Sequence, residues 1–144
     1  YPLRPFIFQN RKAPVFVAQD RDTDRDAFLA ASYNRDNLAG KKTCKTALLQ
    51  HFNLNLPPDR PLIGMTTRFF ERKGIDLVEN ILDDLMKLEV GFVIQGTGEE
   101  RHHYLLQEMS LKYHGRMGLM IGYTEELAHQ IIAGADIFLM PSRY

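Results

Sequence analysis

The chain has 144 residues, with 18 Lys and Arg against 18 Asp and Glu, and 44% of its residues are hydrophobic. This length suffices for one domain with a substantial core. The zero formal charge argues against a nucleic-acid backbone or an anionic membrane as the main partner. The apolar runs are short and interrupted, so we expect no membrane-spanning helix. The single cysteine, Cys44, excludes an internal disulfide and favours a reducing compartment.

The first part of the chain lacks regular patterning. Prolines and scattered aromatics at 1–14 favour extended chain, and residues 14–18 predict one short strand. The run of alternating charge at 20–26 is typical of a solvated loop. As a calcium loop it fails, because Arg25 and Ala31 stand where glycine and glutamate are needed. An Asp-x-Asp motif of a metal-dependent sugar-nucleotide transferase stays open as an alternative.

From about residue 40 the sequence alternates between helical and strand patterns. Helices are predicted from Gly40 to before Pro57, at 74–88, at 97–113 and from an N-cap at Thr124 to about 134, and strands at 62–66, 91–95, 117–121 and 136–140. Thr97 and Glu100 form a capping-box pattern at the start of the third helix. Strands that alternate with helices of this length form βαβ units. The sequence therefore predicts an α/β fold, in which helices cover both faces of a parallel sheet.

Ligands of open parallel sheets bind beyond the carboxyl ends of the strands. The predicted ends carry Thr66-Thr67-Arg68, Gly96-Thr97-Gly98, Gly122-Tyr123-Thr124 and Pro141-Ser142-Arg143. The loop at 68–74 holds three cations, among them Arg68 and Lys73, although the dipole of the following helix disfavours positive charge there. A diphosphate bound among these cations would remove the conflict. The simpler alternative is a solvated loop whose cations are neutralised by Glu71 and Asp76.

The glycines at 96–98 do not fit a dinucleotide-binding motif. The third glycine of G-x-G-x-x-G falls on Arg101, and Glu99 and Glu100 would repel a pyrophosphate. A tight strand-to-helix turn explains these glycines, and a nucleoside can still lie over them. Tyr123 follows a strand, where its ring either stacks on a base or packs with its hydroxyl in water. No metal-ligand or nucleophile spacing joins the remaining candidates, which are Cys44, His51, His102, His103, His114 and His129.

From about residue 37 to residue 144 the chain resembles the C-terminal domain of bacterial glycogen synthases and plant starch synthases. The matching stretches are Gly40-Lys41, Lys45 to Leu49, Thr67-Arg68, Lys73 to Leu77, Gly96 to Gly98, Ile121 to Tyr123, His129, Ala133 to Asp136 and Pro141 to Tyr144. The resemblance implies that residues 37–144 are part of the C-terminal, Rossmann-like domain of a GT-B glycosyltransferase. Residues 1–36 would then be an irregular linker or interdomain segment.

The resemblance also implies a reaction. The family moves glucose from ADP-glucose, in some members from UDP-glucose, to the non-reducing end of an α-1,4-glucan, with retention of configuration and without a metal or other cofactor. By their positions, the resemblance assigns catalysis to Arg68 and Lys73, and nucleotide binding to Gly96, Thr97, Tyr123 and Ser142. The two cations would hold the diphosphate and stabilise the charge that builds up on the departing nucleotide.

Two parts of the family pattern have no counterpart in this sequence: the Glu-Pro-Cys-Gly-Leu stretch that follows Ser-Arg-Tyr, and the N-terminal domain that holds the glucan acceptor. We therefore expect a fragment that cannot transfer glucose by itself, from a bacterial cytoplasm or a plant plastid. Two alternatives stay open. One is another retaining GT-B transferase, of the sucrose-synthase type, and the other is a non-catalytic α/β nucleotide-binding or interaction module.

Overall fold

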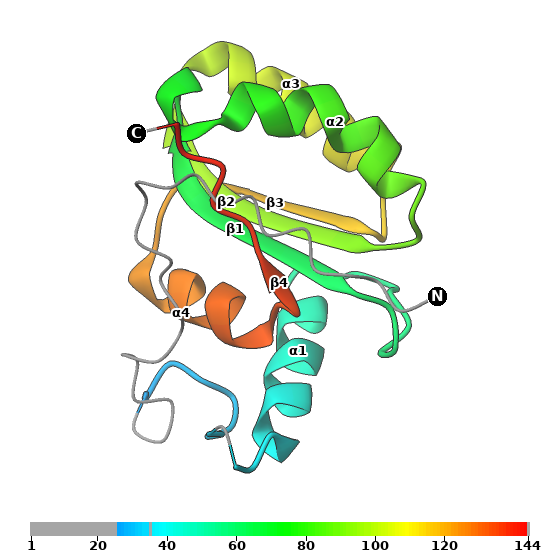
Figure 1. Ribbon diagram of the computed structural model, residues 1–144, viewed down its shortest axis with the longest axis vertical. Helices are drawn as coiled ribbons and strands as arrows, with labels where there is room; N and C mark the ends of the chain where they lie inside the picture. The colour runs from blue at the N-terminus through cyan, green and yellow to red at the C-terminus, as the bar shows by residue number, and fades with distance from the viewer. Residues whose placement is uncertain (1–25, 35, 144) are drawn as a thin grey trace.

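The computed structural model describes residues 26–34 and 36–143 (Figure 1). Its elements are α1 (Ala39–His51), β1 (Leu62–Phe69), the short 3-10 helix η1 (Glu71–Lys73), α2 (Ile75–Met86), β2 (Gly91–Gly98), α3 (Glu100–Lys112), β3 (Met117–Ile121), α4 (Glu125–Gly134) and β4 (Ile137–Phe138). The strands pair in parallel in the order β3-β2-β1-β4. The predicted α/β fold with a parallel sheet is confirmed.

Helices cover both faces of the sheet. In Figure 1, α2 and α3 lie over one face, and α1 and α4 lie over the other. One core cluster, between the sheet and α2 and α3, includes Met65, Phe69, Val78, Leu82, Phe92 and Leu106, and the other includes Leu48, Leu62, Val93, Leu127 and Ile131. The central strands are apolar almost throughout, because alternate residues face the two helical layers.

The two central strands extend three residues beyond their predicted ends. In the added part Thr67 pairs with Gly96, Arg68 with Thr97 and Phe69 with Gly98. The predicted helix start and capping box at Thr97 are therefore wrong. Helix α3 begins at Glu100, and its N-cap residue, Glu99, makes no side-chain cap bond. Pairing with β1 keeps residues 96–98 extended, so residue 98 cannot be the first helical residue that a cap at Thr97 requires.

The glycines of this extension serve close strand packing rather than the predicted tight turn. A Cβ atom on Gly96 would lie 2.0 Å from the carbonyl oxygen of Thr67, and one on Gly98 would lie 2.4 Å from that of Phe69. Non-bonded heavy atoms do not approach this closely, so only glycine fits without a shift of the backbone. Their absent side chains allow β2 to follow β1 to the edge of the sheet.

A buried lysine joins α1 to the beginnings of two strands. Lys45 is 8% exposed, and its Nζ donates to the carbonyls of Pro58 and Arg60 and to the Asp136 carboxylate at 2.9, 2.7 and 2.7 Å. The same carboxylate oxygen accepts from the Leu62 amide at 2.8 Å. This network fastens the loop before β1 and the residue before β4 to the same helix.

Residues 26–34 pack against α1 and α4. His129 joins this segment to α4, because its Nδ1 lies 2.5 Å from a carboxylate oxygen of Asp26 and its ring meets that of Phe28 edge-on at 5.2 Å between centroids. The strand predicted at 14–18 and the charged run up to residue 25 lie outside the described residues. In the described part of the chain, no helix is both long and apolar enough to cross a bilayer.

The Lys45 network predicts a measurable loss of stability. In Lys45→Ala, the Asp136 carboxylate and two carbonyls lose a charged donor, so we expect the free energy of unfolding to fall by about 1.5–3 kcal/mol. Urea denaturation followed by circular dichroism measures this change. Lys42→Ala, at an exposed position of the same helix, is the control and should stay within about 0.5 kcal/mol of the parent. Equal stability of the Lys45 and Lys42 variants would contradict the role of the network.

Candidate nucleotide-binding site

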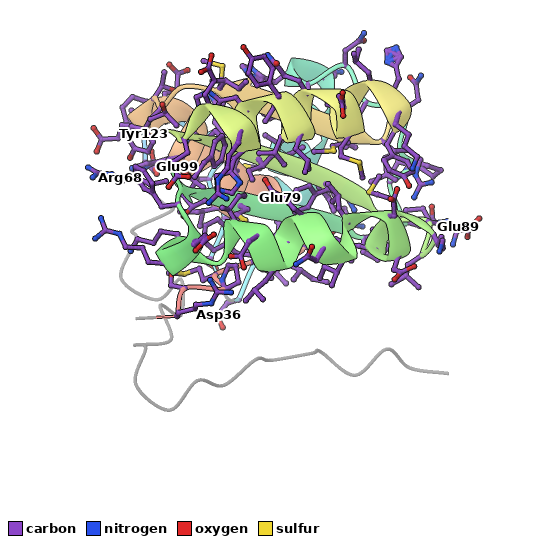
Figure 2. The ribbon with its side chains drawn as sticks, turned by 90° about the horizontal axis from the view of Figure 1, so that it is seen from above. Asp36, Arg68, Glu79, Glu89, Glu99 and Tyr123 are labelled. Atoms are coloured by element: carbon purple, nitrogen blue, oxygen red, sulfur yellow. The ribbon has the colours of Figure 1, made fainter. Side chains whose placement is uncertain are left out.

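Four of the predicted site residues meet at the carboxyl edge of the sheet. Arg68, near the end of β1, pairs with Thr97 of β2, and the Gly122 amide donates to the Gly96 carbonyl at 2.8 Å. This last bond continues the β2–β3 contact by one step and brings Tyr123 to the same edge. Figure 2 shows Arg68 and Tyr123 directed outward at the same end of the molecule.

Lys73 and Ser142 reach this edge from two further segments. Lys73 ends η1, and the following Gly74 adopts a left-handed conformation with φ of 73° before α2 begins. The Pro141 backbone passes so close to this turn that a Cβ on Gly74 would lie 2.3 Å from the Pro141 carbonyl oxygen. Glycine is therefore required at position 74 for both its conformation and its size. The contact places Ser142 beside the turn that carries Lys73.

The carboxylates of the cationic loop are held by other guanidinium groups. Asp76 accepts hydrogen bonds from both terminal nitrogens of Arg143, at 3.0 and 2.6 Å, and Glu71 accepts one from Arg101 at 3.0 Å. The Arg143 hydrogen bond lowers the pKa of the Asp76 carboxyl below its ordinary value. Arg101 also binds Glu99 at 2.8 Å, so it connects the loops that follow β1 and β2. Among the described residues, Glu71 and Asp76 therefore do not neutralise Arg68 or Lys73 by direct pairing.

In the part of the chain that the structure describes, the two cations proposed to hold a diphosphate have no such partner. Among the described residues, no hydrogen bond or ion pair involves the side chain of Arg68 or Lys73. Arg68 is exposed and Lys73 is partly buried. The third cation of the loop, Arg72, lies over the ring of Phe70, with 5.8 Å between its guanidinium carbon and the ring centre. Two unpaired cations at one sheet edge are suited to binding an anion with several oxygens.

The adjacent histidines of α3 contact different parts of the structure near the site. The two side chains point in different directions, as neighbouring positions on a helix do. His103 accepts a hydrogen bond from the Gly98 amide at 3.2 Å, while His102 is buried with its Nδ1 2.7 Å from Glu79. Burial raises the pKa of the Glu79 carboxyl. Within residues 26–34 and 36–143, no three His, Cys, Asp or Glu side chains are grouped as a metal site.

A buried glutamine, which the sequence analysis did not single out, completes this edge. Gln95 has no exposed surface, and its Nε2 donates to the Thr66 hydroxyl and the Thr124 carbonyl, both at 3.1 Å. Its Oε1 accepts from the Thr124 amide at 3.3 Å. Thr124 in turn caps α4 by accepting from the Leu127 amide at 3.2 Å, which confirms the predicted N-cap. The available signal was a polar residue at the end of an otherwise apolar strand.

Comparison with known proteins identifies the family. Residues 48–144 match the family model of the glycosyl transferases group 1. The chain belongs to this family. Among curated members, it is 40% identical to the glycogen synthase of Anoxybacillus flavithermus over 120 residues, which is 83% of this chain and 25% of that protein. It is 43% identical to glycogen synthase 1 of Methylococcus capsulatus over 119 residues, 83% of this chain and 24% of that protein.

The chain therefore spans about a quarter of the length of the curated relatives it matches. Its fold is similar to a solved structure, the catalytic domain of starch synthase IV from Arabidopsis thaliana bound to ADP and acarbose. The TM-score is 0.77 and the sequence identity 31%, over 85% of this chain and 26% of that one. The expected kinship with glycogen and starch synthases, and with it the GT-B type of domain, is confirmed. The individual residue roles and the boundary at residue 36 stay predictions.

The Arg143–Asp76 contact predicts a specific titration. A carboxyl whose pKa is lowered by folding contributes stability above its ordinary pKa, and this contribution is lost as the pH falls through the lower, folded value. We expect Arg143→Gln to return the pKa of Asp76 toward its ordinary 3.8, measured by carbon NMR of the side-chain carboxyl during an acid titration. Arg101→Gln, which removes the partner of Glu71 instead, should leave the pKa of Asp76 low. An unchanged pKa in Arg143→Gln would contradict the assigned cause.

Proposed function

We propose that this chain forms the nucleotide-sugar-binding half of a retaining glucosyltransferase. The enzyme would transfer glucose from ADP-glucose, or from UDP-glucose, to the non-reducing end of an α-1,4-glucan. The observation that carries the proposal is that, within residues 26–34 and 36–143, Arg68 and Lys73 lack carboxylate partners at the same sheet edge as the exposed Tyr123. Relatives named glycogen synthase and a starch synthase structure bound to ADP support the same donor class.

In this proposal the diphosphate of the donor binds between Arg68 and Lys73. Positive charge there lowers the energy of the transition state, because negative charge grows on the departing nucleoside diphosphate as the glycosidic bond breaks. The arginine offers a planar fork of donors and the lysine a mobile point charge. Glu71 and Asp76 compete little with the ligand, because Arg101 and Arg143 already engage them.

The nucleoside would lie toward the other end of the edge. The side chain of Tyr123 is 62% exposed, so one face of its ring is available for stacking on adenine. Gly96 and Thr97 would lie below the ribose. Gly96 would contribute only backbone groups there, because the Thr67 carbonyl and the Phe69 ring fill the space beside its Cα. Ser142, beside the η1 turn, would add a hydroxyl near the phosphates.

Three further features of the proposal concern partners. The glucan acceptor would bind to an N-terminal domain outside these 144 residues, so nucleotide binding is the measurement suited to this chain. The two cations would neutralise the diphosphate without a metal ion or other cofactor, so ADP binding should persist in EDTA. The enzyme would act in a bacterial cytoplasm or a plastid.

The proposal predicts that Lys73 contributes directly to binding of the diphosphate. Lys73→Ala removes one charged donor, so we expect the affinity for ADP to fall about 10- to 100-fold and to become less sensitive to salt. Isothermal titration calorimetry at two ionic strengths measures both effects. Lys87→Ala is the matched control, because Lys87 follows the last residue of the same helix, α2, far from η1. If Lys73→Ala binds ADP as the parent does, a nucleotide-binding module without transferase chemistry becomes the better interpretation.

A donor competition separates the leading proposal from other retaining transferases. Because the adenine ring is proposed to stack on Tyr123, ADP-glucose should displace bound ADP more effectively than GDP-mannose does. UDP-glucose should compete at an intermediate or similar level. A preference for GDP-mannose would contradict the assignment to glycogen or starch synthesis.

A further inference from the structure

We propose that Gln95 is a positioning residue for the nucleoside end of the site. Its carboxamide fixes the peptide groups of Thr124 and thereby sets the direction in which the Tyr123 ring points. The effect of Gln95 on nucleotide binding rests on the proposed function. The contact between Gln95 and Thr124 does not, and the contact and the effect are tested separately below.

The carboxamide of Gln95 makes hydrogen bonds to Thr124 where backbone pairing between β2 and the β3 segment has ended. Backbone contact between β2 and the β3 segment ends with the bond from the Gly122 amide to the Gly96 carbonyl, at 2.8 Å. Beyond that point, Gln95 binds both backbone groups of Thr124, as donor to its carbonyl at 3.1 Å and as acceptor from its amide at 3.3 Å. A side chain therefore continues the contact where main-chain pairing stops.

The orientation of this carboxamide is fixed by its partners. Nε2 faces two acceptors, the Thr66 hydroxyl and the Thr124 carbonyl, whereas Oε1 faces the Thr124 amide. A flipped carboxamide would oppose its NH₂ to the Thr124 N–H and its oxygen to the Thr124 carbonyl, and would lose both bonds. Because Gln95 has no exposed surface, water does not replace these contacts.

The backbone on both sides of Tyr123 needs such an anchor. Gly122 adopts φ of 138°, a conformation open mainly to glycine. Because glycine has many accessible backbone conformations, Gly122 alone does not fix the direction of the residue that follows it. The exposed Tyr123 side chain makes no hydrogen bond among the described residues. Its direction is therefore set by its neighbours, by Gly122 on Gly96 and by Thr124 on Gln95.

The position of Gln95 predicts an effect on the nucleoside alone. Thr124 follows Tyr123 directly, whereas the proposed diphosphate ligands Arg68 and Lys73 are held by β1 and η1. Loss of the carboxamide should therefore weaken binding of ADP while leaving binding of inorganic pyrophosphate unchanged. A general defect in folding would weaken both ligands together.

The experiment compares ADP and inorganic pyrophosphate by calorimetry on the full chain. We expect Gln95→Leu to reduce the affinity for ADP about fivefold to tenfold, in line with the loss of hydrogen bonds to one peptide, and to keep pyrophosphate affinity within about twofold. Thr66→Val is the control, because it removes one contact of Gln95 and retains the two to Thr124. It should change ADP affinity less than Gln95→Leu does.

A double-variant cycle tests whether Gln95 acts through Tyr123. If it does, Gln95→Leu combined with Tyr123→Ala should bind ADP no more weakly than Tyr123→Ala alone. Additive losses would overturn the positioning role, and so would equal losses of ADP and pyrophosphate affinity in Gln95→Leu.

Amide hydrogen exchange provides a readout that needs no ligand. The Thr124 amide, bonded to a buried carboxamide, should exchange about as slowly in the parent chain as the amides within β2, and faster in Gln95→Leu. Rapid exchange at Thr124 in the parent overturns the inference even where Gln95→Leu fails to fold. Slow exchange together with an absence of ADP binding would refute the proposed function and leave the anchoring by Gln95 intact.

Discussion

The parallel pairing of β1 with β2 is the constraint on which the rest of the structure depends. It runs through eight residue pairs, from Leu62 with Gly91 to Phe69 with Gly98. The last three pairs extend past the apolar core and carry Arg68 to the edge, next to Thr97. This extension requires glycine at positions 96 and 98 of β2, because a side chain at either position would clash with the β1 backbone. In this extension the Gly96 carbonyl also accepts a hydrogen bond from the Gly122 amide, which brings the loop after β3 to the same edge.

Charge is separated at this edge rather than neutralised. Arg101 and Arg143 bind the acidic side chains of the loop and of the first turn of α2, so that Arg68 and Lys73 have no partner in the described part of the chain. An arrangement of this kind costs some stability, since like charges gather near a helix start. An anionic ligand would repay it. The cost of this arrangement and the phosphate affinity proposed for it thus have one physical origin.

The two ends of the site are built on different physical principles. At the end proposed for the phosphates, Arg68 is exposed and Lys73 is partly buried, and both would act through charge, which salt screens. At the end proposed for the nucleoside, two hydrogen bonds fix the backbone on either side of the exposed Tyr123. One joins Gln95 to Thr124, and the other joins Gly122 to Gly96. Hydrogen bonds inside the core are not exposed to salt or water, so they give a stacking surface a fixed direction.

The sequence by itself determined the order of helices and strands, the family resemblance and the site candidates, because apolar periodicity and short motifs are properties of neighbouring residues. Only the tertiary structure decided where β2 ends, since the extended backbone at 96–98 is imposed by a second strand. It also decided that Asp76 belongs to Arg143, 67 positions away, and that Gln95 anchors Thr124, 29 positions away. Such pairings depend on which elements pack together, and local pattern does not encode that.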